Sequence, residues 1–140
     1  MSARLHLTGI AEERRAIQAL PRTLAARTQA EAADPIAEAA AADIRASYPR
    51  RTGELAEAVE VQAVEERSAV AAAARVVNTH PLASVFEHGS QARHTALGAN
   101  RGSMPPGNVF IPGMQRARRQ FWPVVAEIMQ GEGLRVTGDA

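Results

Sequence analysis

The residue types that could carry chemistry in this 140-residue chain gather between residues 80 and 94. His80, His88 and His94 lie in this stretch, and Glu87 directly precedes His88. Imidazole and carboxylate groups bind metal ions and act as general bases. A metal-dependent enzyme built on these four residues is one hypothesis. Against it, their spacing matches no ligand motif such as HExxH, and neighbours such as Glu87 and His88 point apart on a helix or a strand.

Other routes to catalysis have less support in the sequence. Ser84, Ser90 and Ser103 lack the context of a nucleophile elbow. Residues 98–103 do not form a phosphate-binding loop, because no strand precedes them and no lysine follows. The chain has no cysteine, which excludes a disulfide framework, a thiolate zinc site and a cysteine nucleophile. We therefore expect no catalytic residue, no bound metal and no cofactor.

Arginine supplies all 16 basic charges, against 15 acidic ones, for a net charge of +1. This balance argues against a dedicated nucleic-acid binder with a broad basic surface. Two local groups of arginines remain as candidate contacts with a partner or with DNA: Arg93 and Arg101, and Arg116, Arg118 and Arg119. Each guanidinium can neutralise a phosphate without reading sequence. The alternative interpretation is that they are solvated charges or salt-bridge partners of a neighbouring subunit.

The elements that must position these residues begin with two helical patterns. Residues 8–20 predict a short amphipathic helix, and Pro21 stops it or opens the next one. Residues 23–48 predict a long alanine-rich helix, within which Asp34-Pro35 predicts a kink or two abutting helices, and Pro49 ends it. Four positions at four-residue spacing define its apolar face: Ile36, Ala40, Ile44 and Tyr48.

The middle of the chain predicts two strands and a short helix. Valines alternate with polar residues over 59–64, which is typical of a strand with one solvated face. A second strand is predicted over 68–78 after a turn at 65–67, although the four alanines at 71–74 are equally typical of a helix. Residues 82–88 predict a short helix that Gly89 ends.

Residues 91–108 have no hydrophobic periodicity, so we expect a long loop without regular structure that a partner orders. Residues 109–111 predict a short strand, with Pro106 and Pro112 rigidifying its two ends around Phe110. Pro112-Gly113 then predicts a turn, and residues 114–129 predict a helix that Pro123 kinks. We expect residues 131–140 to form a flexible tail.

The length predicts one domain, divided into a short N-terminal helix (1–22), a main body (23–130) and the tail (131–140). With 30 alanines and five aromatic residues, the core of a monomer is thin. Long helices or burial against other subunits would offset that weakness. Because no apolar run approaches a membrane span and the N-terminus lacks a signal-peptide pattern, we expect a soluble intracellular protein.

Three short motifs follow one another in a recognisable order. The first consists of Pro49, Thr52, Gly53 and Leu55, the second of Phe86, Glu87, Gly89 and Ser90, and the third of Pro106, Phe110, Ile111 and Pro112. Over residues 24–130 this order resembles the small neck or tail-component proteins of long-tailed double-stranded DNA phages and prophages. Members of that family typically carry Pro-x-x-Thr-Gly-x-Leu, Val-Glu-x-Gly-Thr-like and Pro-x-x-Phe-hydrophobic-Pro segments. This chain departs from them in two places: Ser90 replaces the threonine, and three residues, 107–109, separate Pro106 from Phe110.

The resemblance implies an α+β fold in which a small antiparallel sheet packs against a long N-terminal helix and a C-terminal helix, with the 91–108 loop facing a partner. It also implies a structural protein with no enzymatic activity, located in the neck or tail of the virion and, during assembly, in the host cytoplasm. The implied partners are further copies in a ring, hexameric or of another symmetry that matches the portal or tail, together with neighbouring neck, portal-side or tail tube proteins. Non-specific contact with packaged DNA fits the arginines, and no membrane is involved. A small DNA-associated or regulatory protein that uses its arginines is the alternative.

Overall fold

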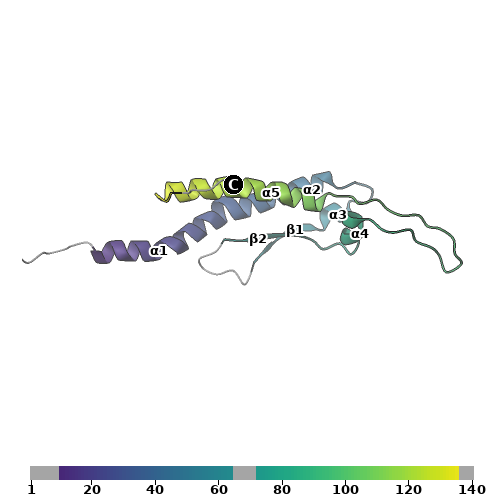
Figure 1. The fold of residues 1–140 in the computed structure, drawn as a ribbon, viewed down its shortest axis with the longest axis horizontal. Coiled ribbons are helices and arrows are strands. Elements are labelled where there is room, and N and C mark those ends of the chain that lie inside the picture. Colours follow the sequence, from purple (N-terminus) through teal and green to yellow (C-terminus); the bar gives the residue numbers. More distant parts are fainter. Residues whose placement is uncertain (1–9, 65–71, 136–140) are drawn as a thin grey trace, which may run out of the picture.

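The computed structural model describes residues 10–64 and 72–135 (Figure 1). Helix α1 (Ile10–Thr28), the π-helical turn η1 (Gln29–Ala33) and helix α2 (Asp34–Ser47) follow one another without a loop. After them come α3 (Glu54–Glu57), β1 (Val59–Ala63), β2 (Ala74–Asn78), α4 (Ala83–His88) and α5 (Phe110–Gly131). The predicted α+β fold is confirmed: a two-stranded antiparallel sheet packs with a long N-terminal helix and a C-terminal helix.

Helix α2 is the centre of the fold, because it contacts α5 and both strands. Helix α5 runs antiparallel to the N-terminal helices. Its first turns meet the end of α2, where Gly113 abuts Ile44, and its last turn reaches α1, where Glu132 pairs with Arg27. In Figure 1 the molecule is therefore elongated, with α5 lying along α2 and residues 90–104 projecting from one end.

The helix expected to stop or restart at Pro21 does neither. Helix α1 continues through Pro21 to Thr28, so residue 22 marks no break between a short N-terminal helix and the main body. A proline inside a helix removes one backbone hydrogen bond and crowds the preceding turn. Contacts between α1 and α5 hold this part of the helix in place, and tertiary packing of this kind supplies most of the stability of helices in proteins.

The interruption predicted at Asp34-Pro35 is confirmed as two abutting helices joined by a π-helical turn. The Asp34 N–H donates to the Gln29 carbonyl, five residues back, and Pro35 sits in the first turn of α2, where a missing N–H is tolerated. The Gln29 side chain also donates to the Asp34 carboxylate and accepts from the Ala73 N–H at 2.9 Å. This turn therefore ties the helices to the segment that leads into β2.

The core is small, as the composition predicts. Its buried members are Ala37, Ala41, Ile44, Tyr48, Val59 and Val76. Within the described residues, Ile44 and Val59 are the largest side chains that are fully buried. Three of the four predicted face positions, Ala40, Ile44 and Tyr48, are buried, whereas Ile36 is half-buried. Much of the core is alanine, so the elements are held by close approach and not by large apolar side chains.

The two predicted strands form an antiparallel pair in which Val59 lies opposite Asn78 and Ala63 lies opposite Ala74. The second strand is shorter than predicted, because Ala72 and Ala73 precede it, and the predicted 65–67 turn and residues 68–71 lie outside the described residues. The Arg45 guanidinium donates to the Val59 carbonyl through Nε at 3.0 Å and Nη2 at 2.7 Å. This contact fixes β1 against α2.

The prediction of a strand over residues 109–111 is wrong. Helix α5 begins at Phe110, and Pro112 and Gly113, predicted to form a turn, lie in its first turns. Pro112 fits there because the first N–H groups of a helix have no partner within it. The helix also begins earlier and ends later than predicted, continuing through Pro123 to Gly131.

The loop predicted to lack regular structure is largely a hairpin. Isolated bridges join Ser90 to Met104 and His94 to Asn100, both antiparallel. Backbone hydrogen bonds between them include Arg93 N–H to the Gly102 carbonyl at 3.0 Å and Arg101 N–H to the Arg93 carbonyl at 2.6 Å. We call residues 90–104 the arm. It was missed because its pairing depends on the backbone and not on alternating apolar side chains.

The predicted tail is attached at its start. Leu134 N–H donates to the Met129 carbonyl at 3.0 Å, Gly133 N–H donates to the Gln130 carbonyl at 2.9 Å, and Glu132 pairs with Arg27. Residues 136–140 lie outside the described part of the chain.

Gly113 tests whether close approach of α5 to α2 stabilises the fold. A Cβ built on Gly113 would lie 2.6 Å from Ile44 Cγ1, which is fully buried. We expect Gly113→Ala to lower the free energy of unfolding by about 1–3 kcal/mol, although alanine favours helices. Gly131→Ala is the matched control, since a Cβ there meets nothing within 4 Å. Equal denaturant midpoints for both variants would show that the contact is unimportant.

Candidate functional site

The second and third motifs meet where Glu87 caps helix α5. The Glu87 side chain, only 5% exposed, accepts three backbone hydrogen bonds: from Val109 and Phe110 to Oε2 and from Ile111 to Oε1, each at 3.0 Å. A carboxylate at this position also interacts favourably with the positive end of the helix dipole. Glu87 is thus the cap of a helix that begins more than twenty residues later in the sequence.

The protonation of Glu87 reflects a balance of two effects. Burial by itself would raise the pKa of the carboxyl group. The three backbone hydrogen bonds, with a smaller contribution from His88, outweigh burial and lower the pKa of Glu87 below its usual value. The carboxylate is therefore charged at neutral pH.

Gly89 allows the first strand of the arm to leave α4 in close contact with residues 104–106, where the second strand of the arm ends. The residue ends α4, as predicted, with a φ of 78° that side chains disfavour. A Cβ on Gly89 would also lie 2.5 Å from the Met104 carbonyl oxygen and 2.9 Å from the Pro106 nitrogen. The second motif therefore fixes both the helix cap and the start of the arm, and Pro106 of the third motif lies at the same junction.

The first motif lies beside the same junction. Asn78 Nδ2 donates to the Leu55 carbonyl at 3.0 Å and to the Tyr48 hydroxyl at 3.1 Å. The Tyr48 ring packs edge-on against Phe86, with centroids 5.5 Å apart. Gly53 precedes α3 with a φ of 82°, as expected for the turn after the long helix, whereas Pro49 and Thr52 are exposed. Residues from all three motifs therefore surround one point of the fold.

The histidines of the metal hypothesis do not converge. His80 Nδ1 accepts from the Leu82 N–H at 3.1 Å, and its Nε2 lies 3.7 Å from Glu54. His88 Nδ1 lies 3.0 Å from the Ser84 carbonyl, and His94 is on the arm. Within residues 10–64 and 72–135, no group of three histidine, aspartate or glutamate side chains could hold a metal ion.

The predicted arginine candidates divide between the arm and helix α5. Arg93 and Arg101 face each other across the arm. On α5, Arg116 pairs with Asp43 of α2 at 2.5 Å, Arg118 borders a groove, and Arg119 is exposed. The structure thus brings together the two arm arginines and engages Arg116 in an intramolecular ion pair.

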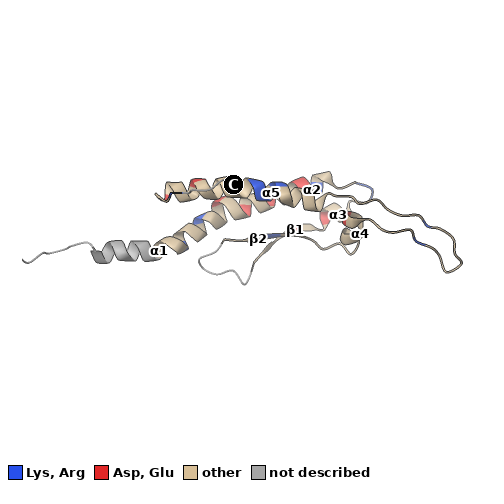
Figure 2. Cartoon of the chain, in the orientation of Figure 1, with Lys and Arg blue, Asp and Glu red and all other residues tan. Residues whose placement is uncertain are grey.

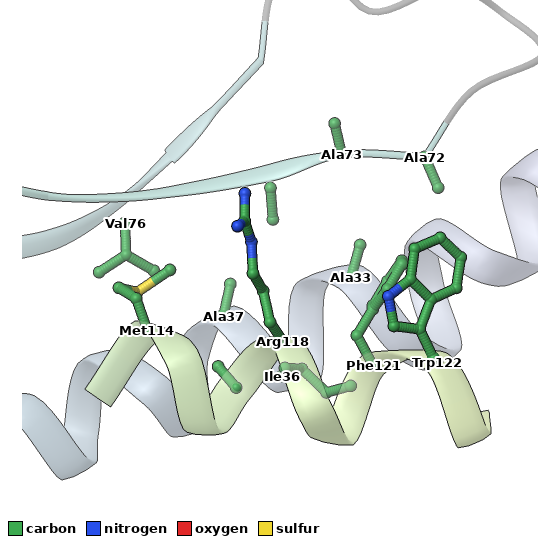
Figure 3. Close-up of a pocket in the computed structure, with 12 residues that line it drawn as sticks. Ala33, Ile36, Ala37, Ala72, Ala73, Val76, Met114, Arg118, Phe121 and Trp122 are labelled. Carbon is green, nitrogen blue, oxygen red and sulfur yellow. The ribbon is translucent and has the colours of Figure 1, made fainter. Parts of the chain in front are cut away.

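An apolar groove of about 540 Å³ runs between α2, β2 and α5 (Figure 3). A second hollow of about 340 Å³ shares Ala72, Phe121 and Trp122 with it and extends toward α1. In Figure 3 Arg118 points from α5 across the groove toward the β2 segment. The groove is otherwise lined by apolar side chains: Ala33, Ile36, Ala37, Ala72, Ala73, Ala74, Val76, Met114, Ala117, Phe121 and Trp122.

Two exposed apolar residues were not predicted as surface features. Leu97, at the tip of the arm, is 98% exposed, and Trp122, on the groove, is 60% exposed. Leu97 lacks any apolar partner at helical or strand spacing within its glycine- and alanine-rich segment, and that isolation was a usable signal. Trp122 follows Phe121 in a predicted helix, where adjacent residues cannot both face the same core. Trp122 adjoins the apolar groove, and contiguous exposed apolar surface of this kind marks sites of interaction.

Comparison of the chain with models of protein families, with curated proteins and with solved structures gives no match. In the described part of the chain, no helix combines the length and the apolar composition that crossing a membrane requires.

Replacement of Glu87 tests the cap. Glu87→Gln keeps the shape but removes the charge and one acceptor oxygen, so at least one N–H of α5 loses its partner. We expect a loss of about 2–3 kcal/mol in the free energy of unfolding at neutral pH, measured by denaturant titration. Glu38→Gln, at an exposed position of α2, should change it by less than about 0.5 kcal/mol. An equally small effect of Glu87→Gln would contradict the capping role.

The difference in unfolding free energy between the original protein and Glu87→Gln should depend on pH in a defined direction. Because the pKa of Glu87 is lowered in the folded state, its stabilising effect is complete above the usual carboxyl pKa of 4.5 and is lost as pH falls through the folded value. The difference in unfolding free energy between the original protein and Glu87→Gln should be constant near neutral pH and shrink below pH 4.5. A difference that grew with acidification would rule out the assigned charge state.

Proposed function

We propose that the chain is a structural virion protein that forms a ring at the neck of a long-tailed phage and joins or completes the tail. Its role is assembly, and we assign it no catalytic activity. Its partners are further copies of itself and the neighbouring neck, portal-side or tail tube proteins. The proposal rests first on the ordered motifs that resemble the neck and tail-component family.

The observation that carries the proposal is that the motif residues act on one another. Glu87 of the second motif caps the helix that begins at Phe110 of the third motif, and Gly89 abuts Pro106. Asn78 links Leu55 of the first motif to the same region through Tyr48. This convergence supports reading the motifs as one set of residues that specify the fold, and the family assignment itself rests on their resemblance.

The exposed apolar surfaces support assembly of several copies. The apolar groove and Trp122, which is 60% exposed, offer a surface on the body of the molecule that a neighbouring copy would cover. Contacts that use two different surfaces of the same protein are heterologous, and they close into a ring when the rotation between copies permits. We assign the groove to a neighbouring copy, whose contact would also compensate for the small core.

The location of the protein tests the neck assignment. We expect it in purified virions, detected by mass spectrometry or a label, and we expect its deletion to leave heads and tails unjoined. Capsid protein from the same particles serves as the internal control. Absence from virions, or normal joined particles after deletion, would refute the proposed function.

Trp122 tests the groove as the contact between copies. Trp122→Glu places a charge on an exposed apolar position, so we expect it to dissociate the ring, seen by native mass spectrometry or light scattering, while the far-ultraviolet circular dichroism remains unchanged. Gln120→Glu, exposed on the same helix, introduces the same charge and should retain the ring. If such proteins assemble only on their partner, incorporation of the two variants into virions gives the same comparison. Equal assembly of both variants would show that the groove is not the contact.

A further inference from the structure

The arm lies in a stretch of the chain with a marked charge bias. Residues 88–126 contain five arginines and neither aspartate nor glutamate, although the chain as a whole has a net charge of only +1. Figure 2 shows these arginines on the projecting arm and on α5. Arg116 is paired with Asp43, whereas the other two arginines of α5, Arg118 and Arg119, form no ion pair among the described residues. Among the described residues, neither Arg93 nor Arg101 forms an ion pair.

The two arm arginines are placed opposite one another. The bridges of Ser90 to Met104 and His94 to Asn100 share one register, which sets Arg93 against Arg101, and the Arg101 N–H donates to the Arg93 carbonyl at 2.6 Å. Like charges directly opposite each other on two strands destabilise the pair. A two-stranded hairpin without other strands is also marginal in water. A partner with negative charge would relieve the repulsion and hold the hairpin.

The rest of the arm is small and polar. Apart from Arg93, Leu97 and Arg101, the arm consists of five alanines and glycines, five serine, threonine, asparagine and glutamine residues, His94 and Met104, and it has no phenylalanine, tyrosine or tryptophan. Protein interfaces are enriched in those aromatic side chains, together with arginine and methionine, so the arm shares only part of that composition. Hydroxyl, amide and backbone N–H groups, in contrast, are regular phosphate ligands. Leu97 stands at the tip, 98% exposed, where minor-groove proteins place an apolar wedge.

We infer that the arm binds the backbone of duplex DNA without sequence specificity, with Arg93 and Arg101 contacting phosphates and Leu97 leading into the groove. Two-stranded ribbons of other proteins lie in the major or the minor groove of a duplex. Duplex DNA is thus the proposed partner of the arm. Binding does not require formation of a ring, because a single copy presents the complete surface.

The test measures how duplex binding by the full chain depends on salt. A fluorescein-labelled duplex of about 30 base pairs is titrated with protein by fluorescence anisotropy between about 50 and about 200 mM salt. Each phosphate contact contributes a slope of about 0.9 to the log–log salt dependence. In Arg93→Gln/Arg101→Gln we expect the slope to fall by about 1.8 per arm, so that over this range the original protein loses about 12-fold more affinity than the variant.

The matched control removes two arginines elsewhere. Arg22→Gln/Arg75→Gln, on exposed positions of α1 and β2, makes the same change in net charge and should retain the original slope. No binding by the original protein, or equal loss in both double variants, would overturn the inference. Polyglutamate, added at equal negative charge, should compete far less than unlabelled duplex. Equal competition would point to an acidic protein surface as the partner instead.

The readouts separate this inference from the proposed function. Arg93→Gln/Arg101→Gln should enter virions and assemble normally even though it binds duplex weakly. Loss of assembly with intact duplex binding would contradict the arm as a DNA contact, because the arm would then serve a protein interface. Normal duplex binding by a protein absent from virions would contradict the neck proposal alone.

Discussion

The structure depends on the carboxylate of Glu87 at the start of α5. The first N–H groups of a helix have no acceptors within it, and buried donors without partners are costly. Here Glu87 accepts from Phe110 and Ile111, as well as from the preceding Val109, and Pro112, the next residue, has no N–H to satisfy. The first backbone bond within the turn then runs from the Gly113 N–H to the Val109 carbonyl at 3.2 Å. The Glu87 side chain and Pro112 together leave no N–H group of the first turn without a partner.

That cap determines where the other parts of the molecule lie. Because α5 starts beside α4, the chain between them must leave and return at the same point, and Gly89 and Met104 meet there. The intervening residues consequently form a hairpin that projects as the arm, rather than a loop that covers the body. The same start also sets α5 antiparallel to α2, with Gly113 against Ile44, which opens the groove further along between the two helices and β2.

The motif resemblance implied the α+β class, whereas the interrupted long helix and both strands were predicted because each carries a local signal: alanine content, a proline, or valines at strand spacing. It did not predict that residues 109–111 begin a helix, because the decisive acceptor is Glu87, which no local pattern connects to them. The arm was missed for a related reason. Its two strands are paired by backbone hydrogen bonds, and their side chains do not alternate between apolar and polar. The motif resemblance identified Glu87, Gly89 and Pro112 as important, but the hydrogen bonds from residues 109–111 to Glu87 became visible only in three dimensions.

The small core and the exposed apolar side chains both reflect the high alanine content of the chain. Alanines let α2 approach its neighbours closely, and they leave large side chains such as Trp122 and Leu97 on the outside. A chain with this distribution gains little from further burial within itself, whereas contact with partners buries the large side chains that lie outside. The body and the arm also differ in character: the groove is apolar, and the arm is cationic and small. Two surfaces of such different chemistry are suited to two partners, so a copy that occupies the groove leaves the arm available for a polyanion.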